Sequence, residues 1–287
     1  MKNVALVLSS GGARGFAHIG AIEALEEQGY LISSIAGTSM GALIGGMYAA
    51  GKLQTLKEWV YALNRRQILS LIDFSLSFNH IVKGDKIIEA LKQLVPDVNI
   101  EDLSIPFCAV ATDLKSNREI VFDKGSLYEA IRASISIPSF FRPMKLNESV
   151  FIDGGVVNPL PLNRVKRIKG DILVAVNVSA PYCSECDKIR ESLLHRQLVE
   201  GYPVIGKFIP YKHEAESNYF SLLSKTFSLM IQQNTVLSIQ LTPPDVLVNI
   251  PMNRFGGFDY VRSEKISREG KKIMKKALME YKQEKSL

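Results

Sequence analysis

A serine within a glycine-rich pentapeptide is the first residue of this chain whose type and surroundings could do chemistry. Gly37-Thr38-Ser39-Met40-Gly41 fits the pattern G-x-S-x-G, in which small flanking residues allow the sharp strand-to-helix turn that exposes a nucleophilic hydroxyl. An apolar run precedes Ser39, and a stretch of small residues typical of a packed helix follows it. A helix N-terminus beneath Ser39 would favour developing negative charge. The pentapeptide also fits a tight structural turn, and the pattern alone does not decide between the two.

A serine nucleophile needs hydrogen-bond donors for the oxyanion that forms in the transition state, commonly backbone N–H groups in a tight turn. Gly11 and Gly12 lie in such a turn, between the first apolar run and a helical pattern. We expect their N–H groups to converge near Ser39 at one edge of a sheet. Binding of a nucleotide phosphate is the alternative, but neither the Walker A pattern nor G-x-G-x-x-G is present at this turn.

The serine also needs a base to accept its proton. Asp153 is the candidate, because it ends an apolar strand pattern and the two glycines after it would let another segment approach closely. A free aspartate with a pKa of about 4 is a weak base at neutral pH, so we expect either that partial burial raises its pKa or that the helix terminus beneath Ser39 assists the serine. The histidines lie in helical or polar stretches where structural or surface roles are the better interpretation: His18, His80, His195 and His213.

The apolar runs predict the elements that position these residues. Val4–Leu8 and Leu31–Ala36 are short buried strands that each end in a glycine turn and precede a helical pattern. Strand, turn and helix in this repeated order predict a mainly parallel sheet with helices on its faces. Ligands bind such sheets beyond the carboxyl ends of the strands, so Gly11, Ser39 and Asp153 are expected to face one crevice. Further strands are predicted at residues 105–111, 119–122, 149–152, 172–178 and 245–250.

Two longer segments are predicted to be mainly helical. Residues 53–94 are irregular, and the apolar stretch 68–78 within them is the predicted lip of the substrate site. Residues 187–242 form the second segment.

The uncharged stretch from Tyr30 to Gly51 has the length of a membrane span, but its hydroxyl residues and five glycines fit a strand, a turn and a buried helix better.

Composition indicates a globular protein of a reducing compartment. Hydrophobic residues make up 46% and charged residues 22% of the 287, a balance that allows a sizeable core and excludes a disordered chain. Cys108, Cys183 and Cys186 are too few and too unevenly placed for a disulfide framework. The last two form a C-x-x-C, interpreted as ordinary thiols because no second pair or histidine cluster accompanies it. We identify no export-signal pattern and expect a cytoplasmic protein.

The positive charge of the chain is concentrated at its C-terminus. Arg262–Leu287 carries nine Lys or Arg and four Asp or Glu, which accounts for most of the formal net charge of +6. Apolar residues recur there at helical spacing, so an amphipathic helix with a cationic outer face is predicted. Such a helix either covers the core or is attracted to an anionic membrane surface. Nucleic-acid binding is not expected, since no nucleic-acid-binding motif accompanies the charge.

These residues together resemble one family, the patatin-like phospholipases, over nearly the whole chain. The glycine-rich turn of the family is matched by residues 10–15, its G-x-S-x-G by 37–41 and its D-G-G by 153–155. A fourth block, A-S-x-x-x-P, is matched by 133–138 in the same order along the chain. Ser10 stands where the family has the first glycine of its turn.

The resemblance implies a three-layer α/β/α sandwich with a mainly parallel central sheet. Residues 1–287 would form a single domain of this kind, with 262–287 as its basic C-terminal helix. No metal or other cofactor is implied, and no carboxylate-rich loop of the EF-hand kind suggests calcium. The resemblance implies no particular oligomeric state.

The resemblance also implies a function for the candidate residues. Ser39 and Asp153 would form a catalytic dyad that cleaves acyl esters of phospholipids, lysophospholipids or simpler lipids through an acyl-enzyme. Gly11 and Gly12 would hold the oxyanion. Arg14 would either brace that turn or add positive charge beside it.

Two other classes of function fit the same fold. An acyltransferase of the malonyl-transfer type also uses a serine elbow, but it would add a histidine partner that this chain lacks in a convincing position. A non-catalytic regulator that binds lipid or protein is the second, and the presence of every dyad and oxyanion residue argues against it. Turnover of a short-chain ester, compared with transfer to an acyl carrier, separates the hydrolase from the acyltransferase. The absence of Ser39-dependent turnover on any acyl donor would favour the regulator.

Overall fold

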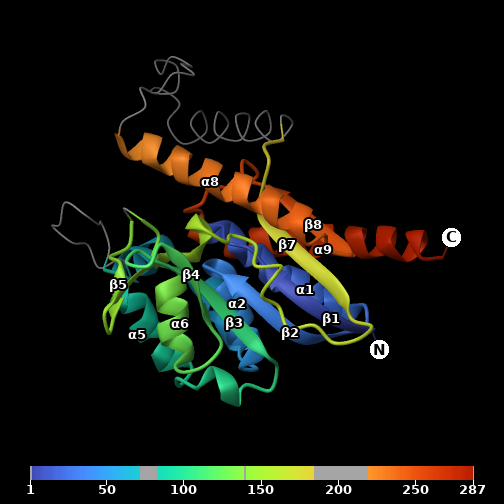
Figure 1. Cartoon of the computed structure of the whole chain (residues 1–287), viewed down its shortest axis with the longest axis horizontal. Helices are drawn as coiled ribbons and strands as arrows, with labels where there is room; N and C mark the ends of the chain where they lie inside the picture. Colours follow the sequence, from blue (N-terminus) through green and yellow to red (C-terminus); the bar gives the residue numbers. More distant parts are fainter. Residues whose placement is uncertain (1, 72–82, 139, 184–218, 287) are drawn as a thin grey trace.

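One central sheet organises the chain, of which the computed structural model describes residues 2–71, 83–138, 140–183 and 219–286 (Figure 1). The strand order is β5-β6-β3-β2-β1-β7-β8, and β4 pairs with β3 beside this path. The strands are β1 (Lys2–Leu8), β2 (Tyr30–Thr38), β3 (Phe107–Asp113), β4 (Arg118–Phe122), β5 (Met144–Leu146), β6 (Ser149–Asp153), β7 (Ile172–Ala180) and β8 (Val246–Pro251).

The middle of the sheet is parallel. Strand β1 pairs in parallel with β2 and β7, β2 pairs in parallel with β3, and β7 with β8. Strands β4 and β6 run antiparallel to β3, and β5 runs antiparallel to β6. The predicted mainly parallel sheet is therefore confirmed, with its antiparallel pairs gathered on the side of β3.

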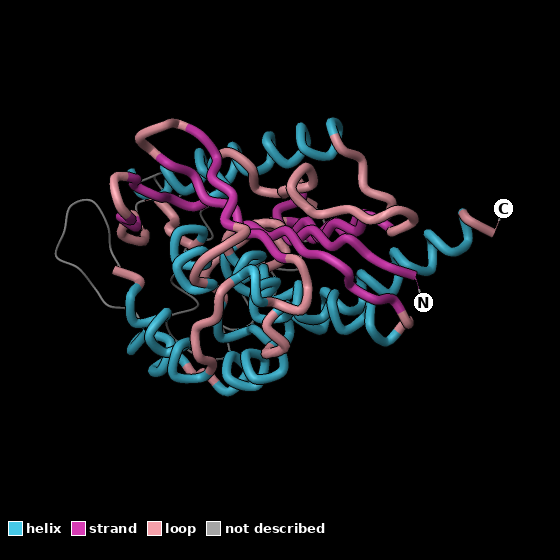
Figure 2. The backbone as a smooth tube through the Cα atoms, turned by 60° about the horizontal axis from the view of Figure 1, so that its bottom comes forward, coloured by secondary structure: helices cyan, strands magenta, loops and turns pink. Residues whose placement is uncertain are grey.

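Helices lie on both faces of the sheet, which makes the predicted three-layer sandwich. Figure 2 shows the strands between two groups of helices, and Figure 1 shows α8 lying across β7 and β8. Helices α1, α2 and α9 cover the other face. The helices and short 3₁₀ turns are η1 (Gly12–Phe16), α1 (Ala17–Glu27), α2 (Met40–Ala49), α3 (Leu53–Ala62), α4 (Arg65–Leu71), α5 (Asp85–Leu94), η2 (Ile100–Asp102), α6 (Leu127–Ser134), η3 (Gly154–Val156), α8 (Tyr219–Leu241), η4 (Tyr260–Arg262) and α9 (Ser263–Glu284).

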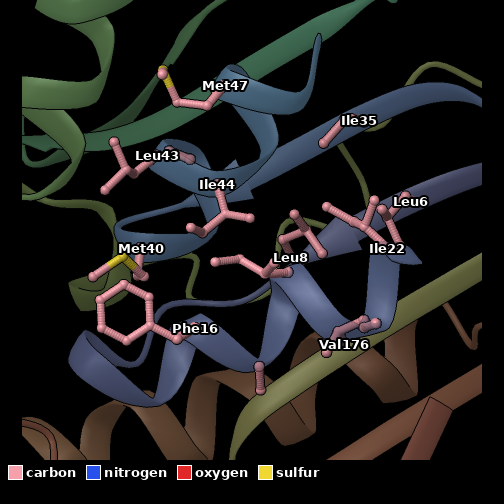
Figure 3. Packing of buried hydrophobic residues seen from close by; sticks show 14 of the residues in the cluster. Leu6, Leu8, Phe16, Ile22, Ile35, Met40, Leu43, Ile44, Met47 and Val176 are labelled. Carbon is pink, nitrogen blue, oxygen red and sulfur yellow. The ribbon is translucent and has the colours of Figure 1, made fainter. Parts of the chain in front are cut away.

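Side chains of β1 alternate between two apolar clusters. Leu6 and Leu8 belong to the large cluster beneath α1 and α2, whereas Ala5 and Val7 belong to the smaller cluster on the opposite face. Figure 3 shows the large cluster, in which Ile44 of α2 packs among side chains from the strands. Burial of both faces explains why the central strands are continuous apolar runs in the sequence. This packing fixes the start of α2 against the ends of β1 and β2.

Helix α9 packs along α1 and occupies most of the predicted basic segment. Its apolar residues Ile266, Met274 and Leu278 are buried in the main cluster. On the flank of the contact, the ammonium of Lys271 lies 3.2 Å from the carboxylate of Glu23. Part of the positive charge of this helix is therefore paired with a carboxylate of α1. The assignment of residues 1–287 to a single domain stays a prediction.

The structure contains elements that the sequence patterns did not predict, and some predicted segments lie beyond its description. Helix α6 and strand β5 were not predicted. The lip predicted at 68–78 is described only as far as residue 71, and residues 184–218 also lie outside the described residues. Among the residues that the structure describes, no helix has the length and apolar character needed to cross a membrane.

Candidate active site

Ser39 occupies a sharp turn between β2 and α2. Its backbone has φ 57° and ψ −121°, a conformation that residues other than glycine rarely adopt. The turn brings the start of α2 against the end of β1, so a side chain at Gly41 would overlap the carbonyl of Leu8. Both glycines of the pentapeptide are thus required by packing, because a side chain at Gly37 would likewise overlap the backbone of Gly41. The strand, turn and helix that the serine motif needs are all present.

Ser134 holds this turn in place. The backbone N–H of Ser39 donates a hydrogen bond to Ser134 Oγ at 2.7 Å, and that hydroxyl donates to the carbonyl of Val110 in β3 at 2.6 Å. Ser134 is buried at the end of α6. The sequence patterns noted this serine only as part of a motif block. Its contact with Ser39 gives that block a physical role.

Asp153 lies directly beside Ser39. The Ser39 hydroxyl donates to Asp153 Oδ2 at 2.5 Å, and the backbone N–H of Gly155 donates to the other carboxylate oxygen, Oδ1, at 2.7 Å. Both side chains are almost fully buried, with 3% and 1% exposure. The carboxylate is therefore held by two donors in a single orientation.

The sheet register explains how Asp153 reaches Ser39. Thr38 pairs with Val110 of β3, and Ala111, the next residue of β3, pairs with Asp153 of β6. Strand β6 is antiparallel to β3, so the chain that ends at Asp153 runs in the direction opposite to that of the parallel strands. The expected meeting of Ser39 and Asp153 is observed, but the pairing of β6 with β3 produces it.

Burial makes Asp153 a stronger base than an ordinary aspartate. Its removal from water raises the pKa of the carboxyl from 3.8 to about 7, although the hydrogen bonds from Ser39 and Gly155 act in the opposite direction. Desolvation is the largest of these effects. A carboxyl with a pKa near neutrality is suited to accept a proton at physiological pH.

The turn after β1 presents free backbone donors. Gly12 has φ 57°, and a side chain there would overlap the carbonyl of Gly257, so glycine is required at this position. Among the described residues, none accepts a hydrogen bond from the backbone N–H of Gly11 or Gly12. Gly12 lines the same pocket as Ser39, while Gly11 packs against Val178 of β7. The oxyanion role of both glycines stays a prediction.

Arg14 connects this turn to the sheet. Its Nε donates to the carbonyl of Val178 at 3.0 Å and its Nη1 to the carbonyl of Met252 at 3.4 Å. Burial lowers the pKa of the guanidinium to about 10, so it stays charged at neutral pH. These contacts with β7 and with the residue after β8 fit the bracing role, the first of the two that the sequence left open for Arg14.

Met40 is a candidate that the sequence reasoning missed. As the first residue of α2, it has no intrahelical acceptor for its backbone N–H. In serine hydrolases with this strand-to-helix turn, the N–H of the residue after the nucleophile contributes to the oxyanion hole. The position directly after Ser39 in the G-x-S-x-G pattern was the signal that could have identified it.

An apolar pocket opens at Ser39. Its walls come from η1, α2, α3, α4, α5, η4 and the segment after α6, and Trp59, Ile68 and Leu71 are among its lining residues. Ile68 and Leu71 belong to the predicted lip, whose described part therefore does line the site. Phe16 and Met40, labelled at one end of the apolar cluster in Figure 3, also line it. Such a pocket suits the hydrocarbon part of a ligand.

Neither histidine nor metal chemistry is evident in the described part of the chain. His18 is fully buried, its Nε2 lies 2.9 Å from the carbonyl of Ser9, and burial lowers its pKa to about 4. It is thus a neutral residue that donates to a backbone carbonyl. His80, His195, His213 and Cys186 lie outside the described residues. No group of three or more potential metal ligands occurs among the residues that the structure describes.

Comparisons with known proteins bear on the same region. A family model described as patatin-like phospholipase matches residues 6–165, which include Gly11, Gly12, Ser39 and Asp153. An uncharacterized NTE family protein of Mycobacterium bovis is 46% identical over 176 residues, covering 61% of this chain and 49% of that protein. Patatin-like phospholipase domain-containing protein 6 of Mus musculus is 30% identical over 186 residues, covering 62% of this chain and 14% of that protein.

A solved structure shares the fold. VipD from Legionella pneumophila superposes with a TM-score of 0.56 at 14% sequence identity, covering 98% of this chain and 67% of that chain. At this identity the likeness concerns the fold alone. The chain spans about half the length of the mycobacterial relative and a smaller share of the mouse protein.

Proposed function

Because this chain belongs to the patatin-like phospholipase family, we propose that it is a lipid acyl hydrolase acting on phospholipids, lysophospholipids or simpler acyl esters. The observation that carries the proposal is the 2.5 Å hydrogen bond from Ser39 Oγ to Asp153 Oδ2 beside an apolar pocket. A serine in hydrogen-bond contact with a carboxylate of raised pKa has the arrangement of an activated nucleophile and its base. The pocket supplies space for the acyl chain.

The proposed mechanism uses the residues already in contact. Asp153 accepts the proton of the Ser39 hydroxyl while Oγ attacks the ester carbonyl carbon. The N–H groups of Gly11, Gly12 and Met40 stabilise the resulting oxyanion. Collapse of the tetrahedral intermediate breaks the ester bond, and the leaving alcohol takes the proton from Asp153. A water molecule then gives a proton to Asp153 and attacks the acyl carbon. When this second tetrahedral intermediate collapses, the Ser39 oxygen takes the proton back from Asp153 and the fatty acid leaves.

We also propose a cytoplasmic location with peripheral contact to anionic membrane. Several lysines of α9 are exposed on the side away from α1, including Lys272 and Lys276, and cations on an amphipathic helix attract anionic headgroups. This contact would bring the enzyme to its lipid substrate. Neither a cofactor nor a nucleic acid is part of the proposal.

The test of the dyad is hydrolysis of a fluorogenic medium-chain ester and of a lysophospholipid. Ser39→Ala and Asp153→Asn are each expected to lower kcat by at least about a thousandfold, as losses of nucleophile or base do in serine hydrolases. Ser286→Ala, an exposed serine near the C-terminus, is the matched control and should retain wild-type activity. Circular dichroism establishes that each variant is folded.

The other outcomes identify the alternatives. Loss of activity in His195→Ala or His213→Ala would replace the dyad with a histidine-containing triad. Transfer of the acyl group to a carrier in preference to water would indicate an acyltransferase. A wild-type protein that turns over no acyl substrate would indicate a non-catalytic regulator.

A further inference from the structure

A second apolar cavity lies beside the Ser39 pocket, beneath α8. Its volume is about 260 Å³. Leu223, Phe227 and Met230 of α8 form one wall, and Thr226 is the single residue with a polar side chain among those that line it. A cavity of this kind suits a hydrocarbon chain and offers no charged side chain for a headgroup.

A thin aromatic partition separates the two cavities. Phe140 and Ile137 line both of them. The ring of Phe140 lies with its centroid 4.8 Å from that of Phe141, which faces the Ser39 pocket, and 4.8 Å from that of Phe258, which faces the second cavity. The two cavities are therefore neighbours with a common wall of apolar side chains.

Two residues close to Asp153 in the chain also line the second cavity. Ile152 and Val156 line it, and they flank Asp153 at one and three residues along the chain. An ester bound at Ser39 would thus have one apolar space beside it and a second behind the wall that Phe140 and Ile137 form between the cavities. A ligand with two hydrocarbon chains that diverge within a few atoms of the scissile ester can place one chain in each cavity.

A diacyl glycerophospholipid has this form, because its two acyl esters are attached to adjacent glycerol carbons. We propose that the second cavity binds the uncleaved acyl chain of a diacyl glycerophospholipid while the Ser39 pocket holds the chain being cleaved. The inference rests on the proposed hydrolase function and specifies its substrate class. A lysophospholipid, with one chain, would leave the second cavity unused.

The proposal predicts a preference that can be measured. Each methylene group moved from water into an apolar site strengthens binding by about fourfold, so even two or three groups in the second cavity favour the diacyl substrate by roughly tenfold or more in kcat/KM. The substrates are a short-chain diacyl phosphatidylcholine and the monoacyl compound with the same chain. Both are used below their micelle-forming concentrations, so that attachment to a lipid surface does not enter the comparison.

Thr226→Trp is designed to fill the second cavity from α8. It should lower kcat/KM for the diacyl substrate about tenfold and leave that for the monoacyl substrate unchanged. Met230→Trp repeats the obstruction from the next turn of the helix. Leu229→Trp is the matched control, since Leu229 is 57% exposed on the same helix and lines neither cavity.

Two results would overturn the inference. The first is an unchanged diacyl-to-monoacyl ratio in both filling variants, either with no loss or with an equal loss on both substrates. The second is a loss confined to long-chain monoacyl substrates, which would mean that one chain spans both cavities. Failure of the hydrolase proposal is distinguishable, because Ser39-dependent turnover would then be absent for both substrates in the wild type.

Discussion

Replacing Asp153 with asparagine should abolish activity and, at neutral and higher pH, raise the free energy of unfolding relative to the wild type. Asparagine keeps the shape of the side chain, so its oxygen can still accept from the N–H of Gly155. Its amide can donate to the Ser39 hydroxyl in place of the present acceptor. What the variant lacks is an ionisable carboxyl, and that group carries a free-energy cost when it is charged in the buried site.

The size of this cost follows from the pKa of Asp153, which burial raises from 3.8 to about 7. At 1.36 kcal/mol per pKa unit, the difference amounts to about 4 kcal/mol. The folded protein binds the proton more tightly than the unfolded chain does, so the contribution of this group to stability is fully present below pH 3.8 and is lost as pH rises through about 7. Such a loss is a large part of the total stability of an ordinary domain.

Urea unfolding of the wild type and of Asp153→Asn at a series of pH values measures the effect. The free energy of unfolding of the variant, minus that of the wild type, should rise by about 4 kcal/mol between pH 4 and pH 8. Other titrating groups act on both proteins alike and cancel in the difference. A difference that stays constant with pH, or that falls, would refute the argument that burial controls this carboxyl.

Three further predictions concern the same site. In the wild type, kcat/KM for a soluble ester should fall about tenfold per pH unit well below pH 7, because the base is then protonated; a flat profile between pH 5 and pH 8 would exclude Asp153 as the base. Ser134→Ala leaves the backbone N–H of Ser39 without its acceptor and should cost about 1–3 kcal/mol of unfolding free energy, with a lower kcat. Ser134→Thr, which keeps the hydroxyl, should retain most of both, and equal behaviour of the two variants would contradict this role. Gly41→Ala forces a methyl group against the carbonyl at the end of β1 and should cost about 3 kcal/mol or more by urea unfolding. An alanine variant as stable as the wild type would show that the turn can relax.

The central strands and the serine turn could be predicted because their signals are local. A strand buried on both faces is an apolar run, as Val4–Leu8 is, and the turn at Ser39 needs small residues within two positions. Partial burial of Asp153 was expected on chemical grounds, as one of two ways to activate Ser39. The predictions of the strands and of the turn depend on neighbouring residues alone.

Helix α6 had a local signal that went unused. Ser126 and Glu129 form the S-x-x-E pattern of a helix N-terminus, and the N–H of Glu129 does donate to Ser126 Oγ at 3.1 Å. The contact that this helix makes through Ser134 could not be predicted in the same way. It joins Ser39 to a residue 95 positions away, and only the packing of α6 on β3 brings them together.

The antiparallel course of β6 and the second cavity were also beyond the sequence. Strand β6 is short, and the same apolar residues could pair in either direction with β3. The cavity is formed by side chains near residues 140, 154, 227 and 258, whose spacing has no period. Features that depend on long-range pairing leave no pattern in a single sequence.

The proposed chemistry and the cost in stability have one origin. A histidine would be a base near neutral pH even in water, whereas an aspartate reaches that range only when the protein withholds water from it. Here Asp153 is 1% exposed, and among the described residues two donors, Ser39 and Gly155, stabilise its charge. A third donor would stabilise the charged form of Asp153 and lower its pKa, which would make it a weaker base. A site that dispenses with histidine must therefore keep its aspartate poorly solvated, and the fold must be stable enough to tolerate the charge.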